Sequence, residues 1–384
     1  MPDLPTVLVV HNRYRWEGGE ERSVDALAAM LARRGHRVEV LQRSSVELDS
    51  RSGRLRAGRA IVGGGWRPEE VAAAARRVKA DVVHVHNMLP LFGPRALGAA
   101  RQTGARVVLH LHNYRLFCAI GVAYRDGAPC YRCHHRNTLP GVRLRCRGNL
   151  PEAIAYGAGL AAHQRSVWRR VDRFVVPGAA AAARLEALGL PSGRTHVVPN
   201  FVEDAAFASE SRAGSGRYAL FAGRLVEEKG ADTAIAAAVA AGVRLRIAGV
   251  GPEEPRIRAL AHRAPPGAVE LLGHLDRAAL VREYEGAAVS LLPSRWGEPC
   301  PRAALESRAL GVPVLGSRIG GVTDIIGDEA SVDPFDVDAW VAALRALWGD
   351  PQRRTALGAA AIADTRERFS ESTFHAGIMR AYTE

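Results

Sequence analysis

The sequence predicts an α/β protein with two doubly wound, parallel sheets in separate domains. Two observations lead to this prediction. Short β-branched runs alternate with helical stretches over residues 6–177, and the alternation starts again at residue 218. Between the two blocks, residues 189–217 are rich in Pro, Gly, Ser and charged side chains, which is typical of a domain boundary.

The first block opens with a strand, a helix and a second strand. The run TVLVVH at 6–11 precedes apolar residues at helical spacing within 20–36, and RVEVLQ follows at 37–42. This order predicts parallel strands joined by a right-handed crossover. Further strands are expected at residues 81–86, 106–112 and 173–177.

The second block repeats the same alternation. Its strands are expected at residues 218–223, 243–249, 269–273, 288–293 and 313–316. The helices between them are expected at residues 230–241, 253–263, 276–286 and 302–310. The last stretch, residues 353–384, predicts two helices with a break near Phe369–Ser372.

Composition indicates a globular protein. The chain has 384 residues, of which 47% are hydrophobic and 24% charged, enough to bury a full core. No apolar run approaches the roughly 20 residues of a membrane-spanning helix, and the N-terminus lacks the pattern of a signal peptide. We therefore expect a cytoplasmic location, with peripheral contact to the inner membrane face left open.

The net charge of +12 is unevenly distributed. Residues 1–200 hold 31 Lys and Arg against 15 Asp and Glu, whereas residues 201–384 hold 21 against 25. A basic N-terminal half indicates an anionic partner, such as a membrane surface, a phosphorylated acceptor or nucleic acid. Its most basic stretches are residues 51–59 and 132–147.

Two loops after predicted strands carry groups suited to anions. Gly18 and Gly19 precede a helix, where backbone N–H groups and the helix dipole favour an anion, although a plain glycine turn is the alternative. Arg224 and Lys229 lie in GRLVEEKG, residues 223–230, and Lys229 is one of only two lysines in the chain. A cation at a helix start is unfavourable unless an anion such as a diphosphate binds beside it.

Two carboxylates follow in GEPCPRAALESRALGVPV, residues 297–314. Pro301 suits the first turn of a helix, so Glu298 is expected in the preceding loop and Glu306 within the helix. Carboxylates so placed can accept hydrogen bonds from sugar hydroxyls at two points along one ligand. The alternative for either glutamate is a solvated surface position.

Histidines end two predicted strands of the first block. His112 ends the strand at 106–112 and is a candidate to touch a reacting group. His84, His86 and His110 lie at or near strand ends as well, and most of the four are interpreted as structural, buried histidines.

Four of the five cysteines lie close together in the sequence. Cys118, Cys130, Cys133 and Cys146 form a C-x11-C-x2-C-x12-C array, which suits a structural tetrahedral zinc site in a reducing compartment. His134 and His135 are substitute ligands in this interpretation, and free thiols or a disulfide are the alternatives.

These segments together resemble the family-4 retaining glycosyltransferases, which have the GT-B fold. The resemblance covers nearly the whole chain and is carried by GGEERSV (18–24), VVPNFVE (197–203), FAGRLVEEKG (221–230), EPCPRAALESRALGVPVLGS (298–317) and IGG (319–321). It implies two Rossmann-like domains facing across a cleft. These would be an acceptor-side domain at 1–198 with a cysteine-rich insertion at 118–146, a nucleotide-sugar domain at 199–366, and a C-terminal helix at 367–384 that crosses back.

The resemblance also implies residue roles. Arg224 and Lys229 would grip the diphosphate of a UDP- or GDP-sugar, and His112 would orient the sugar or the leaving phosphate. Glu298 would contact the sugar and Glu306 the ribose. No cofactor would be required for catalysis, and the acceptor would be a hydroxyl compound, anionic or lipid-linked. The expected donor-binding set is Gly18, Gly19, Arg224, Lys229, Glu298, Cys300, Arg302 and Glu306.

One departure from the family pattern leaves the donor sugar open. Cys300 and Pro301 stand where the family usually has Phe-Gly, and proline removes a backbone donor that would reach the sugar hydroxyls. Two other functions are considered as alternatives: a sugar-nucleotide epimerase or phosphorylase on the same fold, and a non-enzymatic polyanion-binding protein. Nucleic acid is not expected, because no helix-turn-helix, paired zinc finger or RNP signature is found.

Overall fold

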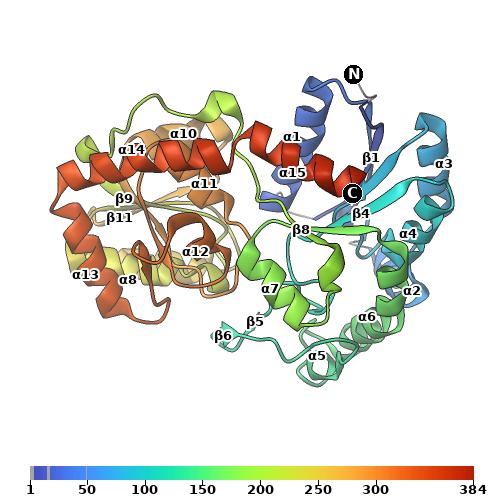
Figure 1. Cartoon of the computed structure of the whole chain (residues 1–384). Coiled ribbons are helices and arrows are strands. Elements are labelled where there is room, and N and C mark those ends of the chain that lie inside the picture. Colours follow the sequence, from blue (N-terminus) through green and yellow to red (C-terminus); the bar gives the residue numbers. More distant parts are fainter. Residues whose placement is uncertain (1–3, 15–17, 49) are drawn as a thin grey trace. The chain divides into compact units, whose positions relative to one another are not determined.

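The computed structural model describes residues 4–14, 18–48 and 50–384. Contacts divide the chain into two compact units. Unit 1 comprises residues 1–123, 130–199 and 375–384, and unit 2 comprises residues 124–129 and 200–374. Each unit has its own parallel sheet, so the predicted fold class of two doubly wound α/β domains is confirmed (Figure 1).

Unit 1 is built on a six-stranded sheet in the order β2-β1-β3-β4-β7-β8, with every neighbouring pair parallel. The strand order reverses between β1 and β3, where open α/β sheets bind ligands beyond their carboxyl ends. The strands are β1 (Val7–Arg13), β2 (Val38–Ser44), β3 (Val82–Val85), β4 (Arg106–His110), β7 (Arg173–Val176) and β8 (Thr195–Val197). The helices are α1 (Gly19–Arg33), α2 (Arg51–Gly63), α3 (Glu69–Val78), α4 (Gly93–Arg101), α5 (Leu139–Arg143), α6 (Leu150–Arg170) and α7 (Ala179–Ala187).

Unit 2 has a second six-stranded parallel sheet, in the order β11-β10-β9-β12-β13-β14. Its switch point lies between β9 and β12. The strands are β9 (Tyr218–Ala222), β10 (Leu245–Ala248), β11 (Val269–Gly273), β12 (Ala287–Leu292), β13 (Val314–Ser317) and β14 (Ser331–Val332). The helices are α8 (Ala231–Ala241), α9 (Glu254–Arg263), α10 (Arg277–Glu285), α11 (Arg302–Ala309), α12 (Gly321–Ile326), α13 (Val337–Trp348) and α14 (Pro351–Arg368).

The unit 2 sheet is buried on both faces. Its strands are apolar along their length, and successive side chains point to opposite faces, so apolar side chains cover both. On β9, Phe221 belongs to the core that contains Trp340 of α13, while Leu220 belongs to the opposite core with Tyr284 of α10. Figure 1 shows α8 and α13 on one side of this sheet and α10 and α11 on the other. This layering holds the strand ends in place for the loops that carry the candidate site.

Two features could be placed only with the structure. A short antiparallel hairpin, β5 (Tyr124–Arg125) with β6 (Ala128–Pro129), lies inside the cysteine-rich segment and groups with unit 2. The predicted break near Phe369–Ser372 is confirmed, since α14 ends at Arg368 and the last helix, α15, spans Glu371–Thr383. Among the described residues, no helix combines the length and apolar character needed to cross a lipid bilayer.

Candidate active site

In unit 2, the loops after β9 and β12 flank the switch point of the sheet. The first loop, residues 223–230, carries Arg224 and Lys229, and the second, residues 293–301, carries Glu298 and Cys300. The sequence separates Lys229 from Glu298 by 69 positions. The sheet brings them together because β9 and β12 are direct neighbours.

The loop at 223–230 is fixed by close backbone approaches. Gly230, which begins α8, has φ +69°, and a Cβ there would lie 2.1 Å from the carbonyl oxygen of Pro293. Only glycine fits this position without strain. Two backbone hydrogen bonds, Leu225 N to Val250 O and Glu253 N to Leu225 O, tie the other end of the loop to the segment after β10. The loop therefore presents its two cations from a defined backbone.

Lys229 is neutralised within unit 2 by Glu298. The Lys229 ammonium donates to Glu298 Oε1, and Ser294 Oγ donates to Glu298 Oε2 over 2.9 Å. The two charged side chains are only 18% and 12% exposed. Arg224, in contrast, is exposed and has no ion pair with any described residue. The two predicted diphosphate ligands thus differ sharply in this ligand-free chain.

The loop containing Cys300 packs tightly against Gly320 and Gly321. Gly321 N donates to Glu298 O over 2.8 Å, and a Cβ on Gly321 would lie 1.9 Å from the carbonyl oxygen of Pro299. The Cys300 carbonyl accepts from Asn200 Nδ2, and burial raises the pKa of the Cys300 thiol to about 12. Cys300 is therefore a protonated, buried side chain in this loop.

Helix α11 starts as predicted after Pro301 and places Glu306 on its second turn. Arg302 Nη2 lies 3.4 Å from Glu306 Oε1, an i,i+4 pair with both side chains mostly buried. The Arg302 Nε is buried without a hydrogen-bond partner among the described residues. The predicted donor residues on α11 are thus brought together, with one guanidinium N–H still unused.

Sequence reasoning missed a second ion pair beside this loop. Arg295 Nη2 donates to Asp232 Oδ1 over 2.8 Å and to Thr233 Oγ1 over 2.7 Å. Burial alone would raise the pKa of Asp232, but the hydrogen bond and charge of Arg295 outweigh it and lower that pKa. This pair fastens the loop after β12 to the start of α8. The pattern of strands and helices in the sequence does not indicate this ion pair, because Arg295 and Asp232 lie 63 positions apart.

The β5–β6 hairpin also contributes to the unit 2 site. Tyr124 OH donates to Glu227 Oε1 over 3.2 Å, and Glu227 lies in the loop that holds Lys229. Burial, followed by the charge of Glu227, raises the pKa of Tyr124 to about 12. A tyrosine from the cysteine-rich segment therefore buttresses the loop with the predicted diphosphate ligands.

In unit 1, His112 follows β4 and is half-buried among other histidines. Its Nε2 lies 2.9 Å from His86 Nδ1. Its ring centroid lies 4.1 Å from that of His110, with nearly parallel planes. Packing and a ring-to-ring contact hold His112 at the carboxyl end of the sheet, as its position in the sequence predicts.

The Gly18–Gly19 turn begins α1, but its first N–H is already used. Gly18 N donates to Glu21 Oε2 and Tyr14 N donates to Glu21 Oε1, each over 2.9 Å. Glu21 is almost fully buried. Burial acts to raise its pKa, but the neighbouring His11, whose Nε2 lies 3.7 Å from Glu21 Oε1, and hydrogen bonds from the backbone outweigh this effect and lower it. The Glu21 carboxylate thus occupies the position at the start of α1 where the sequence predicts a bound anion.

A polar cluster beside this turn was not predicted. Tyr14 OH donates to Glu20 Oε2 over 3.0 Å, and Asn113 Nδ2 donates to the same oxygen over 3.1 Å. The Arg115 guanidinium lies over the Tyr14 ring at 5.1 Å. Burial raises the pKa of Glu20. These groups follow β1 and β4, so they lie at the same sheet end as His112.

The zinc site predicted at Cys118, Cys130, Cys133 and Cys146 is not supported. None of the five cysteines forms a disulfide, and burial raises the pKa of Cys133 to about 11. Among the described residues, the group of His, Cys, Asp or Glu side chains close enough to share a metal is formed by other residues. The exposed His134 and His135 do not complete such a group either.

Two family models match the chain in succession. The model described as Glycosyltransferase Family 4 matches residues 17–206, and the one described as Glycosyl transferases group 1 matches residues 202–364. The chain is 30% identical to a D-inositol 3-phosphate glycosyltransferase of Acidothermus cellulolyticus, over 96% of this chain and 86% of that protein. It is 29% identical to the enzyme of the same name from Kineococcus radiotolerans, over 90% and 85%.

Solved structures share the fold at low identity. A sucrose-phosphate synthase from Thermosynechococcus elongatus matches with a TM-score of 0.75 at 18% identity, covering 99% of this chain and 98% of that one. Anabaena HepE in complex with UDP and glucose matches with a TM-score of 0.68 at 15% identity, covering 99% and 100%. Both likenesses show the GT-B arrangement of two Rossmann-like sheets.

Proposed function

The chain belongs to glycosyltransferase family 4 and is a retaining hexosyltransferase with a nucleotide-sugar donor; on this premise we propose that the donor is a UDP-sugar and the acceptor an anionic hydroxyl compound. The two family models together match residues 17–364, and the first of the relatives named above aligns with 96% of the chain. The alternatives of an epimerase, a phosphorylase and a non-enzymatic polyanion-binding protein are therefore set aside. A UDP-sugar is favoured by the fold relative HepE, which was solved with UDP and glucose.

The observation that carries the donor assignment is the Lys229–Glu298 pair at the switch point of unit 2. A diphosphate is a stronger partner for an ammonium than one carboxylate, since it offers several charged oxygens. On donor binding, Lys229 turns from Glu298 to the diphosphate, and Arg224 adds the second cation. Glu298 is then free to accept hydrogen bonds from the sugar hydroxyls, while Glu306 binds the ribose.

These residues supply electrostatic stabilisation to the departing UDP. Two cations beside the leaving oxygen lower the barrier because they are in place before charge develops there. His112, held by His86 and His110 in unit 1, contacts the donor sugar in this proposal. The acceptor attacks from the same face of the ring that the UDP leaves, as retention requires.

The acceptor site is proposed at the polar cluster of unit 1. Glu20, Tyr14 and Asn113 form hydrogen bonds with one another and lie at the same sheet end as His112. Carboxylate, phenol and amide together recognise hydroxyl groups. The basic half of the chain supplies attraction for a phosphate on the acceptor, in keeping with the inositol phosphate in the names of the full-length relatives.

A thermal-shift screen over UDP-, GDP-, ADP- and dTDP-glucose tests the donor. We expect a clear rise in Tm with UDP-glucose, because a ligand that binds only the folded state stabilises it. Lys229→Met should abolish the rise. A rise with another nucleotide sugar instead would refute the UDP assignment, and none with any would refute the donor site.

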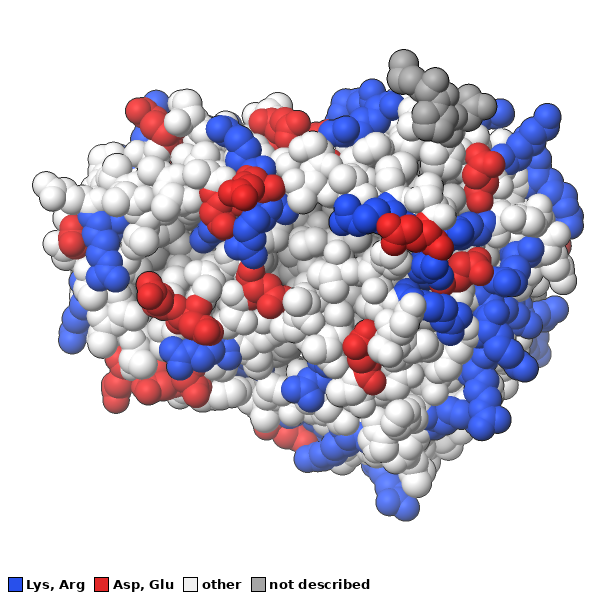
Figure 2. All heavy atoms as spheres, viewed as in Figure 1, with Lys and Arg blue, Asp and Glu red and all other residues white. Residues whose placement is uncertain are grey.

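Peripheral membrane contact is proposed through α2 of unit 1. This helix exposes Arg54 and Arg59 together with Leu55 (66% exposed) and Val62 (54% exposed). Figure 2 shows Lys and Arg gathered over the face of unit 1 on which α2, α3 and α6 lie. Basic and apolar side chains on one short helix are typical of binding at an anionic bilayer surface.

Vesicle co-sedimentation tests this surface. The chain should sediment with vesicles that contain anionic phosphatidylglycerol and stay in solution with pure phosphatidylcholine. Leu55→Gln with Arg59→Gln should weaken the binding, whereas Arg258→Gln, on α9 of unit 2, should leave it unchanged. If the Leu55→Gln/Arg59→Gln double variant and the Arg258→Gln variant bind the anionic vesicles equally, α2 is not the contact surface.

A further inference from the structure

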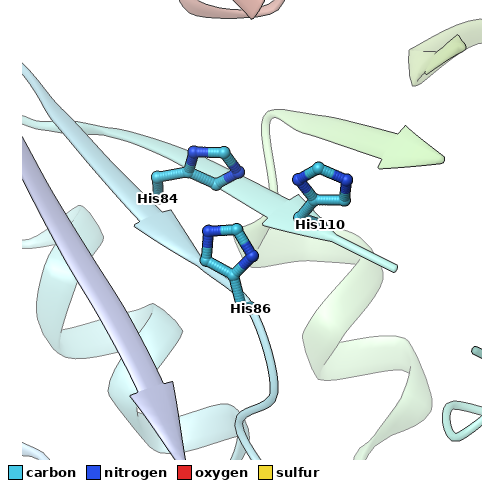
Figure 3. A group of neighbouring side chains, drawn as sticks. All are labelled: His84, His86 and His110. Atoms are coloured by element: carbon cyan, nitrogen blue, oxygen red, sulfur yellow. The ribbon is translucent and has the colours of Figure 1, made fainter. Parts of the chain in front are cut away.

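Three buried histidines of unit 1 are gathered on one face of the sheet. His84 and His86 lie on and just after β3, and His110 ends β4, the neighbouring parallel strand. Because side chains alternate along a strand, the repeated His-x-His in DVVHVH and VVLHLH places these rings on the same side. All three residues are at most 3% exposed. Figure 3 shows the rings around a common space above the strand ends.

The ring nitrogens of these histidines form few hydrogen bonds with the described residues. His84 Nδ1 lies 2.7 Å from the hydroxyl of Tyr382, and His86 Nδ1 lies 2.9 Å from His112 Nε2. The remaining nitrogens, His84 Nε2, His86 Nε2 and both of His110, are buried without partners among the described residues. Buried polar atoms are rarely left so, and each one needs an explanation.

This inventory matches that of imidazole ligands. A histidine that binds a metal through one nitrogen commonly donates the N–H of the other to a neighbouring oxygen or ring, which fixes its orientation. His84 and His86 each have one nitrogen engaged in this way and the other unpartnered.

The spacing of the rings fits a single ion. One ring nitrogen from each histidine lies within 4.8 Å of those of the other two. With metal–nitrogen bonds of about 2.0–2.1 Å in a tetrahedral site, ring centroids are separated by about 5 Å. The observed separations are 4.4 Å for His84 and His86, 5.4 Å for His84 and His110, and 5.1 Å for His86 and His110. The rings are stacked, with interplanar angles of 28°, 3° and 27°, so the proposed site requires the side chains to rotate until their nitrogens meet at a shared ion.

We propose that His84, His86 and His110 bind one divalent transition-metal ion, Zn²⁺ or a metal of similar preference, in the core of unit 1. Imidazole nitrogen suits zinc, copper, nickel and iron rather than the oxygen-seeking Mg²⁺ and Ca²⁺. Three protein ligands leave a fourth position for water. Since the three rings are buried, the ion enters as the domain folds and exchanges slowly afterwards.

The site has a consequence for His112. When His86 Nε2 binds a metal, its proton is confined to Nδ1, and that N–H donates to His112 Nε2. His112 then carries its own proton on Nδ1. The ion thus acts on His112 through His86 and fixes which nitrogen of His112 is a donor. His86 is a positioning residue in this arrangement.

Metal content and X-ray absorption of the full chain test the proposal without any variant. Protein produced in zinc-supplemented medium and then desalted should hold about one equivalent of zinc per chain. The absorption spectrum should show nitrogen ligands at about 2.0–2.1 Å and no sulfur at about 2.3 Å. No retained metal, or a shell containing sulfur, would overturn the proposal. The first outcome would assign the unpartnered nitrogens to bonds among the rings, and the second would return the metal to the cysteines.

Variants locate the ion. His84→Phe keeps the ring volume but removes the ligand, and the zinc content should fall to less than about a tenth of the wild-type value. Cys133→Ser, which removes a competing donor, and His262→Gln, an exposed histidine on α9, should keep the full equivalent. Loss of zinc in Cys133→Ser with retention in His84→Phe would refute the site. If His84→Phe fails to fold, Tyr382→Phe tests the same ring through its hydrogen bond and should release zinc faster to a chelator.

Discussion

Lys229→Met and Arg224→Met form a matched pair that separates donor binding from stability. Both remove a cation predicted to bind the diphosphate, but only Lys229 is paired in the folded chain. Lys229→Met leaves Glu298 mostly buried, with the Ser294 hydroxyl still donating to its Oε2. Arg224→Met removes an exposed side chain that has no ion pair with a described residue. The two variants should therefore weaken donor binding alike and differ in stability.

The magnitudes follow from the loss of one charge-assisted hydrogen bond. Such a bond contributes about 1.5–3 kcal/mol, so either variant should weaken UDP-glucose binding by roughly 10- to 150-fold. Because the Lys229–Glu298 pair is still partly solvated, the lower end, about 1.5 kcal/mol, is expected for stability. This corresponds to a fall in Tm of about 3–6 °C for a domain of this size. Arg224→Met should shift Tm by no more than about 2 °C, as surface substitutions do.

Calorimetric titration with UDP-glucose and thermal unfolding without ligand measure the two effects. The double variant Lys229→Met with Glu298→Gln should recover most of the lost Tm, because it removes the unpaired carboxylate. Equal Tm values for Lys229→Met and Arg224→Met would refute the ion pair as a stabilising contact. Unchanged UDP-glucose affinity in Lys229→Met would refute the diphosphate assignment.

Three further predictions concern residues around the two sites. Tyr124→Phe removes the hydrogen bond to the Glu227 carboxylate and should raise the KM for the donor about two- to tenfold in steady-state assays, since this bond acts on the donor only through the loop that holds Lys229 and passes on about 0.5–1.5 kcal/mol of its contribution. Because burial raises the pKa of Glu20 in the folded chain, the cost of its ionisation is complete above that pKa and disappears as pH falls toward the unfolded value. Glu20→Gln should thus raise Tm at neutral pH, by an amount that shrinks in mild acid. Cys300, a protonated buried thiol, should resist iodoacetamide in the native chain while the half-buried Cys130 reacts, as peptide mass spectrometry would show.

The fold was predictable because local patterns decide it. The alternation of β-branched runs with helical stretches specifies parallel strands, and the observed strands β1 and β9 begin within one residue of the predicted ones. The short hairpin β5–β6 was not predictable, since strands of two residues carry no periodic signal. Its tyrosine reaches Glu227, 103 positions away, and only the folded chain reveals that contact.

The structure brings several of the predicted site residues of unit 2 together, but their contacts could not be read from the sequence. Lys229 and Glu298 were singled out separately for the donor, but their mutual pairing depends on β9 and β12 being neighbours. The zinc prediction erred in the other direction, because closeness in the sequence was taken as closeness in space. The four cysteines are not among the side chains close enough to share a metal ion. The two His-x-His repeats carried the signal for the histidine cluster. It becomes readable only when the strands that hold them are known to be adjacent.

Under the proposed diphosphate role, the pairing of Lys229 gives a physical reason for a lysine at this position in a chain rich in arginine. Arginine would bind Glu298 through two parallel hydrogen bonds in a planar fork and would be slow to leave it. An ammonium is a compact charge with three rotatable donors, so it can exchange a carboxylate for a diphosphate with a small movement of its end. Arg224, which has no such partner to leave, gains nothing from lysine. The proposed roles of the two cations thus match their surroundings, since Lys229 is ion-paired with Glu298 and Arg224 is exposed.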